Sequence, residues 1–328
     1  MTKWRASNPT NADGLTSENV QQHLSLGREA DANLTIISST GQEDDSFFWP
    51  RGWDAAADQS LRGTNNAGYE RMKTDLKIDS KSVKTIVFPP NVNGNVTVEY
   101  SNLNNSDYTD NNGNKVNIGK IRLTYTVSSS DSKHGIIIFS DPTDGFGLLN
   151  ADNVNLTDFS FYDKTGNKIS LADNTAYLAI TSLNHHGVGS IETVTSGKNT
   201  KAYALAGSSI TKQGNSLYAK ESNETIKNGG TWNDETHGGQ WWDNKGPYEY
   251  YGTGILSLSG ADYGMSFSVQ NASVDPGLRA PGNGPWFTFT TIIPETSTPT
   301  RKTTEVHYHY NPSAIDLHFP NNIDDLSI

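Results

Sequence analysis

The chain has 328 residues, with 25 lysines and arginines against 36 aspartates and glutamates, so its formal net charge is −11 at pH 7. This acidic balance argues against a protein that coats nucleic acid through a general basic surplus. Hydrophobic residues make up 34% of the sequence, and no apolar run approaches the roughly 20 residues of a membrane-spanning helix. The 7 Trp, 14 Tyr and 11 Phe can fill a core, so composition predicts a folded domain with a polar surface and no membrane insertion.

Cysteine is absent, which excludes disulfides, thiol nucleophiles and thiolate metal sites. A cysteine-free chain rich in Asn, Ser, Thr and Gly is more typical of Gram-positive surface proteins than of secreted eukaryotic domains. The first residues lack the apolar core of a signal peptide. We therefore expect a fragment of an exported protein, with its export and attachment signals outside the sequence.

Helical features are confined to two short segments near the N-terminus. Residues 15–24 offer a Thr or Ser cap at their start and Gly27 just beyond their end. Residues 54–61 begin with an Asp before three alanines and stop short of Gly63. Both segments are expected to be short helices.

The rest of the domain has the pattern of short strands. β-branched and aromatic runs are separated by turn residues, and Asn93-Gly94, Asn112-Gly113 and Gly166-Asn167 are typical of hairpin turns. Many short strands without long helices between them predict an all-β fold, a large antiparallel sandwich with a few short helices. The expected strands are 33–38, 83–88, 95–100, 120–127, 135–139, 159–162, 176–180, 202–205, 255–258, 265–269 and 286–292.

A Pro- and Thr-rich stretch at residues 293–304 reads as an extended linker. We therefore predict an N-terminal lead-in over residues 1–19, one globular domain over residues 20–293, and a linker with a C-terminal tail over residues 294–328.

A Gly-rich loop carries a cluster of aromatic residues. Trp241 and Trp242 lie in it, and Tyr248 and Tyr250 follow directly. Aromatic planes beside amide and carboxylate groups are what sugar binding requires, because pyranose rings stack on them while their hydroxyls need fixed partners. The alternative is that these aromatic residues form a satellite core under the loop.

A second polar stretch, residues 181–192, follows an apolar strand and carries hydroxyls, an amide, two imidazoles and one carboxylate. Its oxygen donors suit Ca²⁺, with Ser190 and Glu192 as ligands, although a single carboxylate makes a weak site unless backbone carbonyls contribute. On these residues alone, a polar loop without a ligand is the favoured interpretation.

Charged residues give two further hypotheses. Residues 198–227 are locally rich in lysine, and Lys198 and Lys201 at its start are candidates for contacts with an anionic ligand. Asp243 and Glu249 would serve a glycoside hydrolase only if their carboxyl groups faced each other at about 5 to 10 Å, and a solvated rim is the favoured interpretation.

From residue 102 onward, a series of short motifs follows in a recognisable order. Its segments are 102–108, 113–121, 123–127, 141–143, 159–163, 166–169, 181–184, 190–192, 206–210, 217–219 and 251–254. This ordered set resembles the lectin-like variable domain of streptococcal antigen I/II proteins and the glucan-binding protein C family. The resemblance covers roughly residues 20–293, and the ordered set is far more specific than any one motif.

The resemblance implies a lectin-like β-supersandwich with a cleft between loops and a cation near its floor. The family consists of wall-anchored adhesins of Gram-positive bacteria that bind glucans, host glycoproteins or, in the similar enterococcal aggregation substances, extracellular DNA and lipoteichoic acid. Its cleft residues transfer best to Ser182, Asn184 and Glu192. This chain departs from the family pattern at residues 185–187 and in the Trp-rich loop.

We therefore expect a non-catalytic, extracellular adhesin domain, monomeric in isolation, that binds DNA, lipoteichoic acid or glucan in a cleft. Ser182 and Asn184 would form the floor, and the aromatic residues of the Trp-rich loop would form the wall. The alternatives are a glycoside hydrolase or lyase on a similar sandwich, and a passive stalk module.

Overall fold

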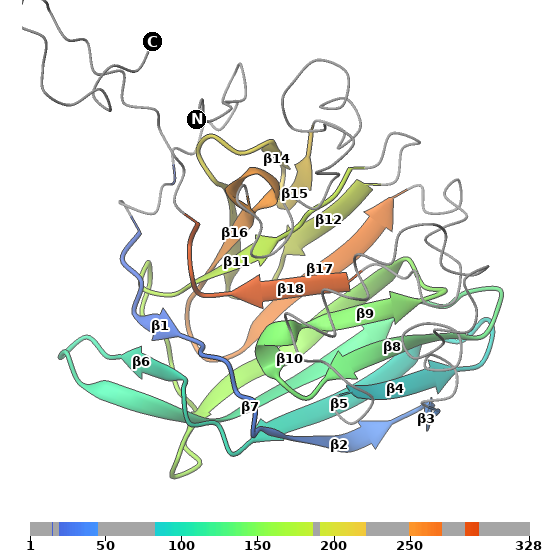
Figure 1. Cartoon of the computed structure of the whole chain (residues 1–328), viewed down its shortest axis with the longest axis horizontal. Helices are drawn as coiled ribbons and strands as arrows, with labels where there is room; N and C mark the ends of the chain where they lie inside the picture. Colours follow the sequence, from blue (N-terminus) through green and yellow to red (C-terminus); the bar gives the residue numbers. More distant parts are fainter. Residues whose placement is uncertain are drawn as a thin grey trace, which may run out of the picture. The chain divides into compact units, whose positions relative to one another are not determined.

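The computed structural model describes residues 15, 20–44, 83–185, 191–220, 249–270 and 286–294 (Figure 1). The expected helix at residues 54–61 lies outside these residues, and so do residues 295–328 of the expected linker and tail. Residues 1–297 form one compact unit and residues 298–328 a second, and the predicted limits at residues 20 and 293 stay predictions. Within the described residues, no helix is long and apolar enough to cross a membrane.

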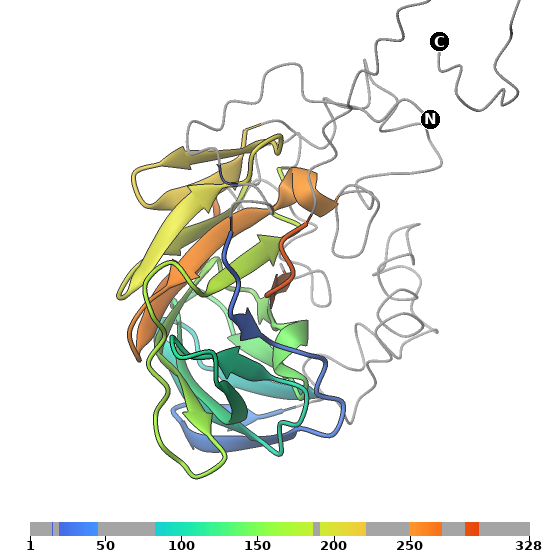
Figure 2. The ribbon, with the colours of Figure 1, turned by 90° about the vertical axis from the view of Figure 1, so that its left-hand side faces the viewer.

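The larger of two sheets has ten strands, and its long strand β7 pairs with three others. Residues 115–117 of β7 pair with β6 and residues 120–127 with β5, while β10 lies on its other side. In Figures 1 and 2, β2 lies at one end of this sheet and β14 and β15 at the other. The strands are, in order, β1 (Leu24–Ser25), β6 (Asp107–Thr109), β7 (Lys115–Val127), β10 (Asn153–Asp163), β17 (Tyr263–Gln270), β12 (Ile191–Ser196), β15 (Ser216–Ala219) and β14 (Ile210–Gln213), with β5 (Gly94–Ser101) next to β7 and β2 (Asn33–Ser39) next to β5.

The second sheet has eight strands, all paired antiparallel. They are, in order, β13 (Thr200–Ala204), β16 (Gly254–Leu258), β11 (Tyr177–Thr181), β18 (Trp286–Thr290), β9 (Phe146–Leu149), β8 (His134–Phe139), β4 (Val83–Phe88) and β3 (Gln42–Glu43). The helical segments among the described residues are two 3₁₀ turns, η5 (Pro142–Asp144) and η8 (Glu249–Gly252).

The two sheets pack through an aromatic core. Phe146 and Phe287 of the eight-stranded sheet contact Tyr125 and Phe267 of the ten-stranded sheet, with ring centroids 5.0 to 5.3 Å apart across the sheets. All four rings are buried. Two antiparallel sheets around one apolar core form a β-sandwich, which confirms the predicted fold class.

Each strand expected from the sequence is present, with ends that differ by a few residues. In β5, buried and more exposed side chains alternate along the strand, as expected where one face lies on the core and the other on solvent. The long strand β10 deviates near Asp158, which has φ 52° beside a register shift in its pairing with β17. This is a β-bulge, and it lets an 11-residue strand follow the twist of the sheet.

Two local predictions are wrong. Residues 20–23 are not helical, and Leu24 lies in strand β1. Asn93-Gly94 is not a hairpin turn: it leads from β4 in one sheet to β5 in the other, and an added Cβ on Gly94 would overlap the ring of Phe88. In both cases tertiary contacts outweigh the local pattern.

The non-helical N-terminal segment is held in place by hydrogen bonds to the backbone of distant segments and by apolar packing. The Gln22 side chain donates to the carbonyls of Tyr177 (2.8 Å) and Thr291 (2.7 Å) and accepts from the Tyr177 amide (3.0 Å). Leu15 pairs with Leu205, and Leu15 and Val20 pack on a second apolar cluster that includes Tyr177 and Leu205. A helix would remove these contacts, which explains the extended conformation.

Candidate functional site

The polar turn that follows β11 begins with a residue in an unusual conformation. Ser182 has φ 60°, in the left-handed region that side chains other than glycine rarely adopt. The next residue, Leu183, is fully buried and donates its backbone N–H to the carbonyl of Gly252 at 2.9 Å. The buried leucine anchors the turn, so that Ser182 and Asn184 on either side of it are partly exposed.

A buried carboxylate fixes the conformation of this turn by hydrogen bonding. Oε2 of Glu192 accepts the backbone N–H of Asn184 at 2.8 Å and its side-chain Nδ2 at 3.1 Å, and Glu192 returns its own N–H to the Asn184 carbonyl at 2.9 Å. The Asn184 Nδ2 also donates to the Ser182 carbonyl and lies 3.2 Å from its Oγ. Glu192 is 4% exposed. Ser182, Asn184 and Glu192 thus form one connected hydrogen-bonded unit.

Segments that are far apart in the sequence meet at this turn. Nδ1 of His185 lies 2.9 Å from the carbonyl oxygen of Ala219, and His185 also pairs with Ile191 at the start of β12. Because β11 belongs to the eight-stranded sheet while β12 and β15 belong to the other, the turn crosses between the sheets. We call residues 182–185 the floor; exposed Lys220, the residue after Ala219, lies beside it.

The two candidate lysines at the start of the lysine-rich stretch do not lie at the floor. Lys201 pairs with Ser257, which pairs in turn with Tyr177 at the opposite end of β11 from Ser182. Lys198 lies beyond the end of β12 that is remote from Glu192. Strand register therefore separates both lysines from the floor by four or more residues, about 13 Å. Adjacent numbering in a β-sandwich does not imply one binding surface.

Of the four aromatic residues expected to form the wall of the cleft, the structure describes Tyr250. Tyr250 lies in η8, is 6% exposed, and packs in the second apolar cluster with Tyr251 and Ile255. Its ring therefore contributes to a satellite core, which differs from the exposed position expected for it. Trp241, Trp242 and Tyr248 lie outside the described residues, and so does Asp243, the proposed partner of Glu249.

Of the two residues expected to bind calcium, the structure describes Glu192. Oε2 of Glu192 already accepts two hydrogen bonds from Asn184, and Ser190 lies outside the described residues. Among the side chains that the structure describes, no group of three or more His, Asp or Glu is arranged to hold a metal ion. The calcium site stays a prediction.

The described floor presents a hydroxyl, an amide and an imidazole held in place by backbone and carboxylate contacts. Such groups position the hydroxyls of a ligand by hydrogen bonding. Sequence reasoning missed the anchoring roles of His185, Ala219 and Gly252. No local signal could have found them, because the two contacts use backbone carbonyls of distant segments, Ala219 in β15 and Gly252 in η8.

Comparison with known families identifies the group to which this sandwich belongs. Residues 7–290 match the model of the family described as glucan-binding protein C. The chain belongs to the glucan-binding protein C family. The match spans most of the sequence and includes the whole of the described sandwich.

Solved structures of similar fold include glucan-binding protein C of Streptococcus mutans, with 24% identity over 87% of this chain and 82% of that one and a TM-score of 0.57. That structure was presented as support for a role in both sucrose-independent and sucrose-dependent adherence. The adhesin domain of PrgB from Enterococcus faecalis has 19% identity over 88% of this chain and 93% of that one, with a TM-score of 0.58.

The same PrgB domain has also been solved bound to DNA, with 20% identity over 86% of this chain and 98% of that one and a TM-score of 0.58. Glucan-binding protein C and the PrgB adhesin domain are binding proteins rather than enzymes. These comparisons confirm the resemblance found in the sequence and the expectation of a non-catalytic adhesin domain.

Proposed function

We propose that this domain captures a neutral glucan-like polymer at the floor formed by residues 182–185. The observation that carries the proposal is the hydrogen-bonded unit where the two sheets meet. In it, the uncharged side chains of Ser182 and Asn184 are held in place by the buried carboxylate of Glu192. A preorganised set of hydrogen-bonding groups suits a polyhydroxylated ligand, because little conformational entropy is lost on binding. Membership of the glucan-binding protein C family supports the same ligand class.

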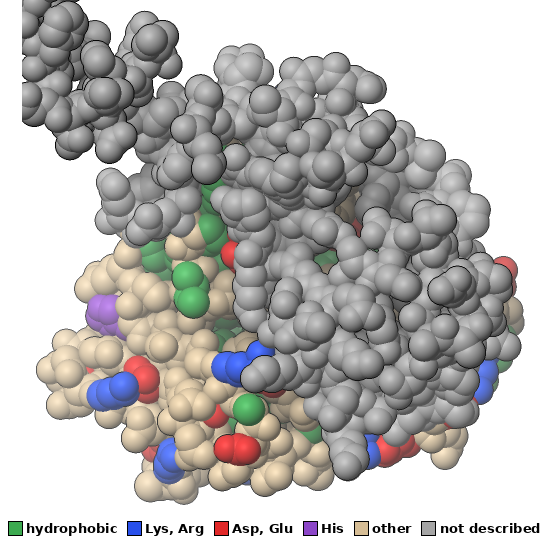
Figure 3. All heavy atoms as spheres, viewed as in Figure 1, with side chains coloured by type: hydrophobic (Ala, Val, Ile, Leu, Met, Phe, Trp, Pro, Cys, Tyr) green, Lys and Arg blue, Asp and Glu red, His purple; other side chains and the backbone are tan. Residues whose placement is uncertain are grey.

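Electrostatics also favours a neutral polymer. The chain carries a net charge of −11, and strand register places Lys198 and Lys201 away from the floor. On the coloured part of the face in Figure 3, basic and acidic side chains are dispersed rather than gathered into a basic patch. A phosphate polymer that approaches the molecule would be repelled by this net negative charge.

DNA or lipoteichoic acid is the second candidate. The DNA-bound PrgB structure supports DNA, and so does exposed Lys220 beside the floor. We propose in addition that the domain acts outside the cell in a wall-anchored protein that promotes aggregation and attachment. A host glycoprotein as partner and a structural Ca²⁺ near Glu192 belong to the same proposal.

A binding screen of the purified chain tests this function. α-Glucan, lipoteichoic acid, and single- and double-stranded DNA are titrated at several salt concentrations. Glucan is expected to bind with little dependence on salt, because a neutral polymer releases no counterions. If DNA binds instead, its affinity should fall steeply with salt, and Lys220→Gln should lower the slope of log affinity against log salt by about one.

Variants locate the site. Asn184→Ala combined with Ser182→Gly should weaken polymer binding about tenfold, because two ligand hydrogen bonds of about 1 kcal/mol each are lost in part. Glycine keeps the left-handed backbone of Ser182 unstrained. Asn155→Ala with Thr157→Ala, two exposed positions on β10, is the matched control. Equal binding by both double variants would contradict a site at the floor.

A further inference from the structure

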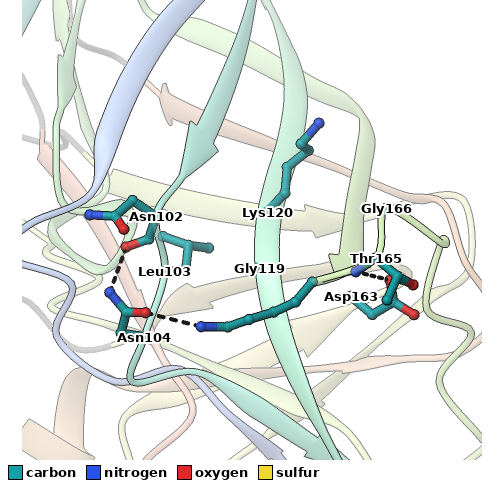
Figure 4. A pocket seen from close by; sticks show the side chains of 9 residues that line it. Asn102, Leu103, Asn104, Gly119, Lys120, Asp163, Thr165 and Gly166 are labelled. Carbon is teal, nitrogen blue, oxygen red and sulfur yellow. Dashed lines mark hydrogen bonds between the residues drawn. The ribbon is translucent and has the colours of Figure 1, made fainter.

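A pocket distinct from the floor lies between the loop that follows β5 and the turn that follows β10. Asn102, Leu103 and Asn104 line one side, residues 163–166 line the other, and Gly119 and Lys120 of β7 lie between them (Figure 4). Its volume of about 430 Å³ is within the range of small-molecule sites. The strand β10, ten residue steps long, separates this end of the sheet from the end near Glu192 by about 30 Å.

Lys164 reaches across the pocket. Its Nζ donates to Oδ1 of Asn104 on the opposite side at 3.0 Å. An ammonium group has three donors, and within the described residues this one makes a single hydrogen bond, to a neutral amide. Lys120, the second cation of the pocket, instead pairs with Glu99 at 3.1 Å. Lys164 therefore brings a charge into the pocket without a carboxylate in direct contact with it in the described part of the chain.

A glycine in the middle of β7 makes room for this lysine. A Cβ added to Gly119 would lie 2.9 Å from Cα and 3.1 Å from Cγ of Lys164, closer than side chains tolerate. The stem of Lys164 thus lies directly against the strand. Glycine weakens a strand interior, so its presence here is explained by the close approach of another chain segment.

The carboxylate in the pocket is already engaged. Asp163 accepts hydrogen bonds from the backbone N–H groups of Thr165 and Asn167, from the Thr165 hydroxyl at 2.7 Å and from the Asn167 amide. These bonds hold the pKa of Asp163 below its ordinary value, the Thr165 hydroxyl being the largest cause and the Asn167 backbone the next. Its oxygens face the turn, and the side-chain amides of Asn102 and Asn104 donate to the backbone carbonyls of Asp31 and Asn102. The ammonium group of Lys164 is therefore the principal donor for a ligand.

Further lysines continue from the pocket across the sheet. Lys120 and Lys168 lie on the ring of Tyr162 at 5.8 and 5.7 Å from its centroid. Lys168 contacts Asp262 at 2.6 Å, and Lys198 acts on the same carboxylate electrostatically. Four lysines thus accompany four carboxylates in this region, because buried Glu29 also lies beside the pocket and accepts the backbone N–H of Asn104 at 2.8 Å.

From this geometry we propose that the pocket is a second binding site, one for an oxyanion, with phosphate carried on a sugar or polyol as the ligand class. The phosphate would bind the remaining donors of Lys164, and the side chains of Asn102 and Asn104 would contact the attached hydroxyls. Charge-assisted hydrogen bonds to phosphate oxygens are stronger than the bond of Lys164 to a neutral amide, so the ligand would displace that bond. The proposal is independent of the polymer bound at the floor.

Titration with glycerol phosphate, inorganic phosphate and plain glycerol at constant ionic strength, followed by amide NMR, tests this site. Both phosphates should shift the signals of Gly119, Thr165 and Gly166, and glycerol should not. Tighter binding of glycerol phosphate than of inorganic phosphate would show that the attached polyol is also recognised. Shifts of equal size with glycerol would overturn the proposal, as would no shift with either phosphate.

Substitutions separate a specific site from general charge attraction. Lys164→Gln should weaken phosphate binding at least fivefold, Lys164→Arg should restore it to within about twofold, and Gly119→Ala should weaken it by displacing the stem of Lys164. Lys115→Gln removes an exposed lysine of the same strand outside the pocket and serves as the control. Asn184→Ala should leave the titration unchanged. Equal loss in the Lys164 and Lys115 variants would contradict a built site.

Discussion

Glu192 shows how one buried residue positions a polar turn. Its carboxylate accepts two hydrogen bonds from Asn184, and both would be lost without an oxygen acceptor at that position. A buried N–H without a partner costs about 1–3 kcal/mol. Glu192 is therefore best described as a positioning residue for the floor rather than as a residue that contacts the polymer.

Glu192→Ala should lower the free energy of unfolding by about 1–3 kcal/mol, and Glu192→Gln should lower it less, because the glutamine carbonyl still accepts from Asn184. Urea denaturation measures both. The control is Glu99→Ala, which removes a surface ion pair to Lys120 worth at most about 1 kcal/mol. Equal effects of the two alanine substitutions would show that the Asn184 contact adds nothing.

Two aspartates at the start of tight turns have the same arrangement. Asp110 accepts the backbone N–H groups of Asn112 and Asn114, as Asp163 accepts those of Thr165 and Asn167. The pKa of Asp110 is lowered chiefly by the hydrogen bonds from Asn114. Both turns continue with a glycine at positive φ. The sequence pattern Asp-x-x-Gly-Asn thus marks these turns without any tertiary information.

These pKa values predict a loss of stability in acid. An aspartate whose folded-state pKa is depressed contributes stability above its unfolded pKa of about 3.9, and the contribution disappears as pH falls through the folded value. The urea concentration at the unfolding midpoint should therefore decrease as the pH is lowered below about 4. Asp163→Asn combined with Asp110→Asn should flatten this dependence while keeping an acceptor for the turns. An unchanged pH profile in the double variant would disprove the link.

At the scale of elements, alternation marks strands of the ten-stranded sheet such as β5, whereas β8, β11 and β16 of the other sheet are buried at every position and were predicted as continuous apolar runs. The short strands β1, β3 and β6 were not predicted, and neither were β9, β12, β14 and β15. β9 has four residues, and β12, β14 and β15 combine polar residues with few large apolar ones, so none of them has a long apolar or alternating run in the sequence. Their pairing comes from neighbours: β12, for example, pairs along its whole length with β17.

The connection between η5 and β9 depends on a glycine that composition alone does not reveal. Gly145 has φ 74°, and an added Cβ would overlap the backbone oxygen of Phe287. Gly145→Ala should therefore lower the free energy of unfolding by about 3 kcal/mol or more. Gly113→Ala is the matched control: φ is 82°, open space surrounds it, and only the backbone cost of about 1–2 kcal/mol applies. Thermal unfolding compares them, and similar losses of Tm would refute the close approach.

At the scale of the whole molecule, sequence reasoning recovered the fold class and the family but only part of the site. Ser182, Asn184 and Glu192 came from the family resemblance, and the structure joins them in one unit. Lys198 and Lys201 were grouped with them by proximity in the sequence. Strand order and register, which depend on the pairing of the entire sandwich, place these lysines at the other end of the strands.

The central claim is that a polymer is held at the floor between the two sheets. Hydrogen exchange of the full chain, with and without saturating α-glucan, tests it most directly. We expect slower exchange over residues 182–185 and at Lys220, no change over residues 163–166, and loss of the protection in the Asn184→Ala and Ser182→Gly double variant. If the exchange rates of residues 182–185 are unchanged while the glucan is bound, the account is contradicted.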